Sequence, residues 1–143
     1  MNEKVLPHLM APYRLALLPG DGTGRDVMEE VKRILSTFKE SGAISLETTE
    51  IPCGGQHYLD TGEEWPSGSF EYCRDESDAI VVGAVGWPGA ILPNGDIAGG
   101  QALLGLRSAL DLYANVRPVK LYKGVKHKVH GTFMDVWDNE LVD

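Results

Sequence analysis

The stretch RLALLPGDGTGRDV, residues 14–27, joins a short apolar run to a cluster of glycines and then to a helical pattern. Arg14 to Leu18 predicts a β-strand, and Pro19 with the three glycines after it ends that strand in a tight turn. A helix from about Arg25 to Lys39 is expected next. Its apolar side chains recur at offsets of three and four and form one stripe, Val27, Val31, Ile34, Leu35 and Phe38.

The chain beyond this unit continues the alternation of strand and helix. Residues 44–51 alternate apolar and polar side chains, as expected for a half-buried strand near a sheet edge. The glycine-rich segment 54–66 predicts a loop, and residues 70–75 predict a short helix. Ala79 to Val85 is a continuous apolar run, which fits a strand covered on both faces. This order predicts an α/β fold with a parallel sheet.

The segment after the third strand predicts a loop, a helix and a further strand. Gly86 to Gly100 holds so many glycines and prolines that a mobile surface loop is expected. A helix is expected from Gln101 through Leu112. Residues 113–122 predict a strand in which Pro118 cannot donate a backbone hydrogen bond.

The composition excludes several classes of partner. The chain has 143 residues, 24% of them charged, and a net charge of -8, so neither nucleic acid nor an anionic membrane surface is an expected partner. We find no signal peptide near the N-terminus and no apolar run long enough to span a membrane. Cys53 and Cys73 form no C-x-x-C pair, which favours a reducing, cytoplasmic location.

The glycine turn allows two interpretations. A strand that ends in Gly20, Gly22 and Gly24 before a helix can present backbone N–H groups to an anion or nucleotide. The spacing is not that of the G-x-G-x-x-G fingerprint, and Asp21 would repel a phosphate beside it. The other interpretation is a tight turn that requires positive φ angles.

Arg107 and Arg117 are the candidate anion-binding residues. On a helix Arg107 lies beside Leu103 and Leu104, so a cation borders an apolar patch. Such a surface suits a small acid with a carboxylate at one end and an alkyl group at the other. Two solvated arginines in surface ion pairs are the alternative that spacing alone favours.

Three segments in order resemble the β-decarboxylating dehydrogenases of isopropylmalate, isocitrate, tartrate and D-malate. They are LLPGDGTGRDV (17–27), DAIVVGAVG (78–86) and GLRSALDLYANVRPV (105–119). The resemblance implies an incomplete isopropylmalate dehydrogenase-like α/β fold rather than a Rossmann domain. It also implies a leader at 1–12, the N-terminal part of a large domain at 13–100 and the start of a small, dimerisation domain at 101–143.

The same resemblance implies a site and a reaction. Arg107 and Arg117 would clamp the carboxylates of a malate-type substrate, Leu103 and Leu104 would form its apolar wall, and Thr23 with Gly22 would lie against NAD or NADP. In the family the 2-hydroxyl is oxidised by hydride transfer and the 3-carboxylate leaves as carbon dioxide, with Mg²⁺ or Mn²⁺ as Lewis acid. A homodimer or other homo-oligomer is implied as well.

The resemblance discriminates only partly between substrates. Leu103 and Leu104 resemble the wall of isopropylmalate enzymes, but Gly100 stands where those enzymes usually carry an acidic residue. Residues 85–88 look more like the tartrate and D-malate group. Ala102 replaces the polar contact usual in isocitrate enzymes, which makes isocitrate the least expected substrate.

The catalytic and metal-binding residues of the family are expected beyond Asp143. Its third substrate arginine, its tyrosine and lysine, and its metal-binding aspartates have no counterpart in this sequence, so the chain is expected to hold no catalytic or metal residue and to be inactive alone. His127 and His130 match no strong metal-ligand spacing. The alternative is a noncatalytic regulatory or assembly subunit that keeps the binding arginines. Continuation of the gene past Asp143 would discriminate between the two.

Overall fold

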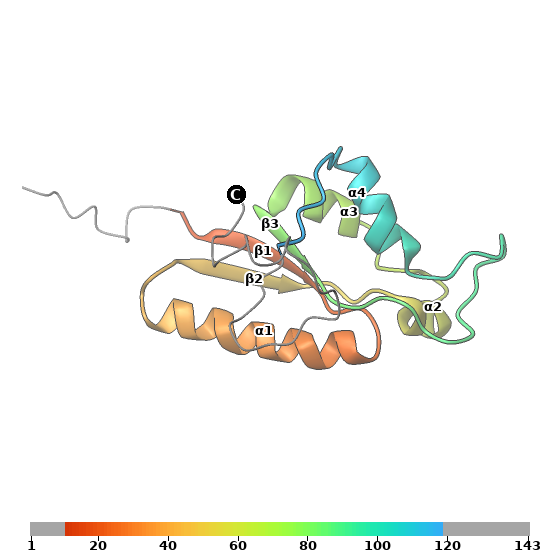
Figure 1. Ribbon diagram of the computed structural model, residues 1–143, viewed down its shortest axis with the longest axis horizontal. Helices are drawn as coiled ribbons and strands as arrows, with labels where there is room; N and C mark the ends of the chain where they lie inside the picture. The colour runs from red at the N-terminus through yellow and green to blue at the C-terminus, as the bar shows by residue number, and fades with distance from the viewer. Residues whose placement is uncertain (1–10, 119–143) are drawn as a thin grey trace, which may run out of the picture. The chain divides into compact units, whose positions relative to one another are not determined.

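The computed structural model describes residues 11–118, and they form an α/β arrangement around a parallel sheet (Figure 1). The strands are β1 (Tyr13–Leu18), β2 (Leu46–Glu50) and β3 (Ala79–Val82), in the sheet order β2-β1-β3. β1 pairs in parallel with both neighbours, so that Leu15 lies opposite Thr48 on one side and Ala79 on the other. The predicted fold class is confirmed, with the first strand at the centre of the described sheet.

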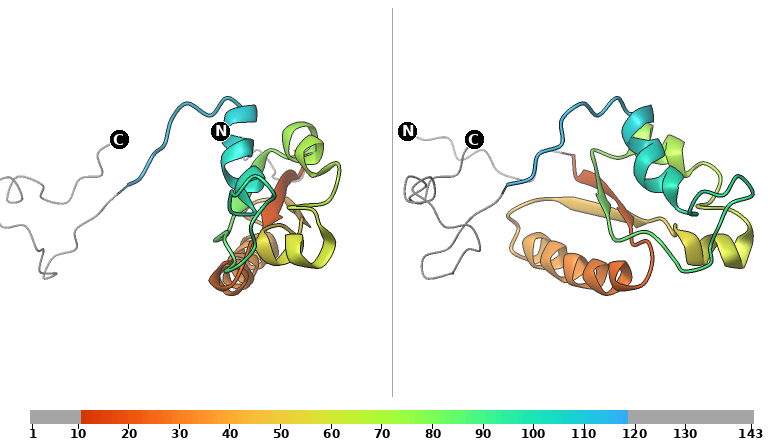
Figure 2. Two further views of the ribbon diagram at one scale, coloured as in Figure 1. Left: turned by 90° about the vertical axis from the view of Figure 1, so that its right-hand side faces the viewer. Right: turned by 45° about the vertical axis from the view of Figure 1, so that its right-hand side comes forward.

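Helices cover both faces of this sheet. They are α1 (Thr23–Glu40), α2 (Gly55–Thr61), α3 (Ser69–Glu71), α4 (Leu106–Ala109) and the π-helical segments η2 (Tyr72–Glu76) and η3 (Gln101–Gly105). α1 lies along one face, and α3 and α4 lie over the other (Figures 1 and 2). α2 lies at the end of the sheet where β1 and β2 terminate (Figure 1). The chain divides into two compact units after Asp111, so residues 112–118 belong to the second unit.

The core follows from the alternation of side chains along β1. Ala16 and Leu18 are buried in one cluster with residues that come from four other segments, namely Ile51, Cys53, Cys73, Ala102 and Leu106. Leu17 points to the opposite face because successive strand residues alternate, and it is buried like Met28 of α1. Both faces of β1 are therefore covered, as a central parallel strand requires.

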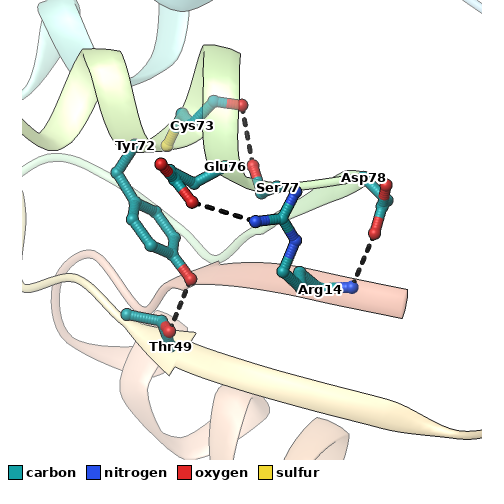
Figure 3. A network of polar contacts seen from close by, with 7 residues as sticks. All are labelled: Arg14, Thr49, Tyr72, Cys73, Glu76, Ser77 and Asp78. Carbon is teal, nitrogen blue, oxygen red and sulfur yellow. Dashed lines mark hydrogen bonds and ion pairs between the residues drawn. The ribbon is translucent and has the colours of Figure 1, made fainter. Parts of the chain in front are cut away.

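A polar network joins β1 to η2 and to the start of β3 (Figure 3). The backbone N–H of Arg14 donates to Asp78 Oδ2 at 2.7 Å, and the Arg14 guanidinium donates to Glu76 at 2.9 Å. Tyr72 donates its hydroxyl to Thr49 Oγ1 of β2 at 2.6 Å. Arg14 thus joins the start of β1 to η2 and to the residue before β3, and Tyr72 joins η2 to β2 near the end of that strand.

Four predicted elements differ from the structure. Residues 55–61 are a helix and not part of a loop. The Asp21 carboxylate accepts backbone N–H groups at the start of this helix, and Gly62 ends it in the left-handed conformation at φ 83°. In β2 only Leu46 is buried, since the other strand residues face solvent on this edge strand. β3 ends at Val82 and is only half-buried at Ile80 and Val81, with exposed residues at both ends; in the described sheet it is an edge strand too. The helix that begins at Gln101 ends by Ala109, before a positive φ of 53° at Asp111.

Three further predictions concern the segment after Leu112, the loop 86–100 and the apolar side of α1. Residues 113–118 form no strand, and the rest of the strand predicted to reach Tyr122 lies outside the described residues. The segment 86–100 is irregular as predicted, but Ala90 and Ala98 are buried and a bridge joins Ile91 to Ile97. The apolar stripe of α1 is only partly buried. Its Val31 and Leu35 are half-buried on the face of the buried Met28, whereas the other three stripe residues are exposed, Val27, Ile34 and Phe38.

Gly24→Ala is expected to destabilise the fold by about 1 to 3 kcal/mol, the usual cost of overpacking. A Cβ there would lie 2.4 Å from the Pro19 carbonyl oxygen and 2.6 Å from backbone atoms of Ala84. Gly100→Ala is the matched control, since its Cβ would meet no atom within 4 Å and its φ of -60° suits any residue. Urea unfolding of both variants measures the difference, and equal stabilities would contradict the steric argument.

Candidate functional site

The glycine turn after β1 packs closely against the backbone that follows β3. A Cβ at Gly20 would lie 2.1 Å from the carbonyl oxygen of Ala84, and one at Gly83 would lie 2.1 Å from that of Pro19. Gly20 has a φ of 72° and Gly22 a φ of 48°, as the tight-turn interpretation requires. Gly22 and Thr23 nevertheless remain exposed at the start of α1, so the turn also leaves backbone accessible there.

Asp21 has a structural role that the sequence pattern did not indicate. Its side chain is turned inward and only 2% of the residue is exposed. Oδ2 accepts the backbone N–H groups of Gly55 and Gly86, each at 2.8 Å, and Oδ1 accepts that of Gln56 at 2.9 Å. One carboxylate thereby joins the glycine turn, the start of α2 and the loop after β3.

Glu64 makes a second connection of this kind. Its carbonyl oxygen accepts the N–H of Gly54 at 2.9 Å, next to the Asp21 site. Its carboxylate Oε1 accepts the N–H groups of Gly99 at 2.5 Å and Gln101 at 3.3 Å. The segment from Gly54 to Glu64 therefore links the glycine turn to the start of η3.

An open hollow of about 690 Å³ lies beside η3. Its walls come from Glu64, from Val85 after β3, from the loop 92–100 and from η3; they are Glu64, Val85, Leu92, Asn94, Gly95, Asp96, Ile97, Ala98, Gly99, Gly100, Gln101, Leu103, Leu104 and Gly105. The lining includes two of the predicted substrate-binding residues, Leu103 and Leu104, and Leu104 is 60% exposed. An accessible apolar wall is thus present.

The other predicted site residues are not brought into this hollow. Arg107 is exposed on α4, three residues beyond Leu104, and does not line it. Arg117 belongs to the second unit, where its Nε lies 3.3 Å from Asn115 Oδ1. Thr23 and Gly22 lie at the start of α1, outside the lining.

A smaller hollow of about 320 Å³ lies where β1 and β2 end, between α1 and α2, and was not predicted. Arg25 and His57 line it together with three carboxylates, Glu29, Glu50 and Asp60. Lys32 donates hydrogen bonds to Glu29 and to Glu50. Both bonds raise the pKa of Lys32, and the one to Glu29 has the larger effect. Cys53 also lines the hollow, and burial raises the pKa of its thiol to about 11. This thiol is protonated at neutral pH and is not an activated nucleophile.

Residues 11–118 contain neither a cluster of metal ligands nor a helix that could cross a membrane. Within that range, no three His, Cys, Asp or Glu residues come together in a way that could hold a metal ion. His127 and His130 lie outside it. None of the helices in the range has the length and apolar character needed to cross a membrane.

Comparison with known proteins gives one consistent result. The profile of the family described as isocitrate/isopropylmalate dehydrogenase matches residues 14–139. The 3-isopropylmalate dehydrogenase of Clostridium pasteurianum is 37% identical over 117 residues, and that of Thermobifida fusca is 41% identical over 118; each match covers 82% of this chain and 32% of the relative. The chain thus spans about a third of the length of the curated relatives it matches.

A solved structure is similar as well. The β-decarboxylating dehydrogenase of Thermococcus kodakarensis superposes with a TM-score of 0.57 at 30% sequence identity. The match covers 75% of this chain and 29% of that one. The likeness therefore extends to the arrangement of the strands and helices.

Asp21→Asn is expected to lower the free energy of unfolding by about 2 to 3 kcal/mol, because hydrogen bonds to a buried charged group are lost and an amide NH₂ would face a backbone N–H. Asp26→Asn removes the same charge from an exposed position in the first turn of α1 and is the control. Urea unfolding should show a much smaller change for the control. Equal losses would refute a special role for Asp21.

Alkaline pH is expected to destabilise the fold through Cys53. Because its folded pKa of about 11 lies above its ordinary value of 9.0, the stabilisation is complete below pH ~9 and is lost as the pH rises to about 11. The loss should be on the order of 2 kcal/mol. Unfolding curves of the wild type and Cys53→Ala from pH 7 to 11 measure it. A constant difference between the two proteins would contradict this prediction.

Proposed function

Because the chain belongs to the isocitrate/isopropylmalate dehydrogenase family, we propose that it forms the N-terminal part of an NAD(P)-dependent enzyme that oxidatively decarboxylates a malate-type 2-hydroxy acid. The substrate class is isopropylmalate, or tartrate and D-malate. The relatives named 3-isopropylmalate dehydrogenase support the first of these. The isolated chain is proposed to be inactive, since it spans about a third of those relatives.

The observation that carries the proposal is the apolar wall formed by Leu103 and Leu104 at an open hollow, with Arg107 on the next turn of the same helical run. A hydroxy acid with an alkyl substituent needs both features. Burial of its hydrocarbon part away from water is favourable, and its carboxylate accepts charge-assisted hydrogen bonds from a guanidinium. Within residues 11–118, Arg107 has no ion pair that would compete for it. In the proposed complex Arg107 and Arg117 orient the substrate, and the leucines exclude water from its alkyl group.

The nicotinamide nucleotide is proposed to lie against Gly22 and Thr23. These residues are exposed where α1 begins, and the first turn of a helix favours the negative charge of a phosphate. When bound, the nicotinamide would accept the hydride from the 2-hydroxyl carbon. The divalent metal that the resemblance implies finds no ligand set among residues 11–118, and no step is assigned to it.

The protein is further proposed to form a homo-oligomer and to be located in the cytoplasm. Val27, Ile34 and Phe38 expose apolar surface on α1, and large exposed apolar surfaces are typical of sites that another segment or subunit covers. The net charge of -8 favours a small-molecule ligand recognised by individual arginines over a polyanionic partner.

Replacing either arginine is expected to weaken substrate binding in the full-length protein. Arg107→Ala and Arg117→Ala should each reduce the affinity for 3-isopropylmalate or D-malate by about 2 to 5 kcal/mol, the cost of removing one partner of a buried charge pair. Isothermal titration measures the affinities. Arg33→Ala is the control, since Arg33 is exposed on α1 and pairs only with the adjacent Glu30 among the described residues.

An unchanged affinity would remove that arginine from the site. A full-length protein that binds the acid but oxidises none of these substrates would instead favour a regulatory or assembly subunit.

A further inference from the structure

Glu64 lines the larger hollow, and its carboxylate contacts two other residues of the lining. It comes from the segment that follows α2, whereas most of the lining comes from residues 92–105. Its Oε1 is fixed by the N–H groups of Gly99 and Gln101, at 2.5 and 3.3 Å. A side chain held in this way has little rotational freedom, so its second oxygen has a defined position as well.

That second oxygen, Oε2, receives no hydrogen bond from any residue between 11 and 118 in the structure. Asp96 is the other acid of the lining; its Oδ2 accepts the Asn94 amide at 2.7 Å, and the residue is exposed, whereas Glu64 is half-buried. Glu64 is therefore the less exposed of the two acids, and no residue between 11 and 118 donates to its Oε2. Its neighbours in the lining include Val85, Leu103 and Leu104, which cannot donate a hydrogen bond.

We propose that Glu64 is a specificity-determining residue whose Oε2 accepts a hydrogen bond from a hydroxyl group of the ligand in this hollow. The inference rests on the proposed function, which supplies two hydroxyl-bearing ligands, the 2-hydroxy acid and the ribose of the nucleotide. A carboxylate repels phosphates and other carboxylates, so it selects a neutral donor at this point. Glu64 thus complements the arginines, which take the anionic groups of the ligand.

Gly100 provides an independent way to test this assignment. It lies between Gly99 and Gln101, whose N–H groups fix Glu64, and it carries no side chain of its own. Its φ of -60° and ψ of -33° suit any residue, and a Cβ there would meet nothing within 4 Å. A carboxylate can therefore be added at position 100 without steric cost, next to the one that Glu64 supplies.

The experiment compares Glu64→Gln, the control Glu63→Gln and the double variant Glu64→Gln with Gly100→Glu in the full-length protein. Glutamine keeps a carbonyl oxygen for Gly99 and Gln101 but replaces Oε2 by a donor, so loop structure and ligand contact are separated. Isothermal titration with NAD⁺ alone and with D-malate or 3-isopropylmalate alone identifies which hydroxyl is bound, and KM and kcat are measured for both. Amide hydrogen exchange at residues 99–101 shows whether the loop is intact.

The expected result is an affinity about ten-fold lower for one of the two ligands in Glu64→Gln, with unchanged hydrogen exchange, since hydrogen bonds to charged groups have this strength. Glu63→Gln should bind both ligands like the wild type, and the double variant should recover affinity. Wild-type affinity of Glu64→Gln for both ligands would overturn the inference while the proposed function stands. A wild-type protein that binds neither ligand would overturn the proposed function and this inference together.

Discussion

The carboxylate of Asp21 is the interaction on which the arrangement of the loops depends. It is almost fully buried and accepts three backbone N–H groups, from Gly55, Gln56 and Gly86. A buried charge is tolerated only when its oxygens are satisfied, and buried N–H groups are tolerated only when they are paired. The carboxylate and the N–H groups satisfy one another, so the glycine turn, α2 and the loop after β3 are held in one relative position.

Steric constraints reinforce this electrostatic one. The backbone at Gly20 and Gly24 approaches Ala84 too closely for a side chain, and Gly83 approaches Pro19 in the same way. Glu64 then extends the connection to η3 through its backbone and its carboxylate. Leu103 and Leu104 belong to η3, and the position of η3 depends on the irregular backbone before it, which the carboxylates of Asp21 and Glu64 hold through hydrogen bonds.

Local patterns predicted those parts of the fold that local forces determine. β1 and α1 follow from a compact apolar run and from helical spacing, and their observed bounds differ from the predicted ones by one or two residues. α2 could not be predicted in this way, since the carboxylate that satisfies its first N–H groups lies 34 residues earlier in the chain. The contacts that form the candidate site could be predicted only in part, for the same reason. Leu103 and Leu104 line the hollow, and their role toward a substrate stays a prediction; Asp21 and Glu64 act on distant backbone, and such contacts leave no periodic signal in a sequence.

The number of residues in the π-helical turn η3 affects how the side chains before and after it are oriented. Its hydrogen bonds span five residues where those of an α-helix span four, so the turn accommodates one residue more than α-helical geometry would. Deleting Gly105, which lies between Leu104 and Arg107, would remove this extra residue and rotate Leu103 and Leu104 about the helix axis relative to Arg107. The length of this segment therefore sets the angle between the two leucines and Arg107, whichever side chains stand at these positions.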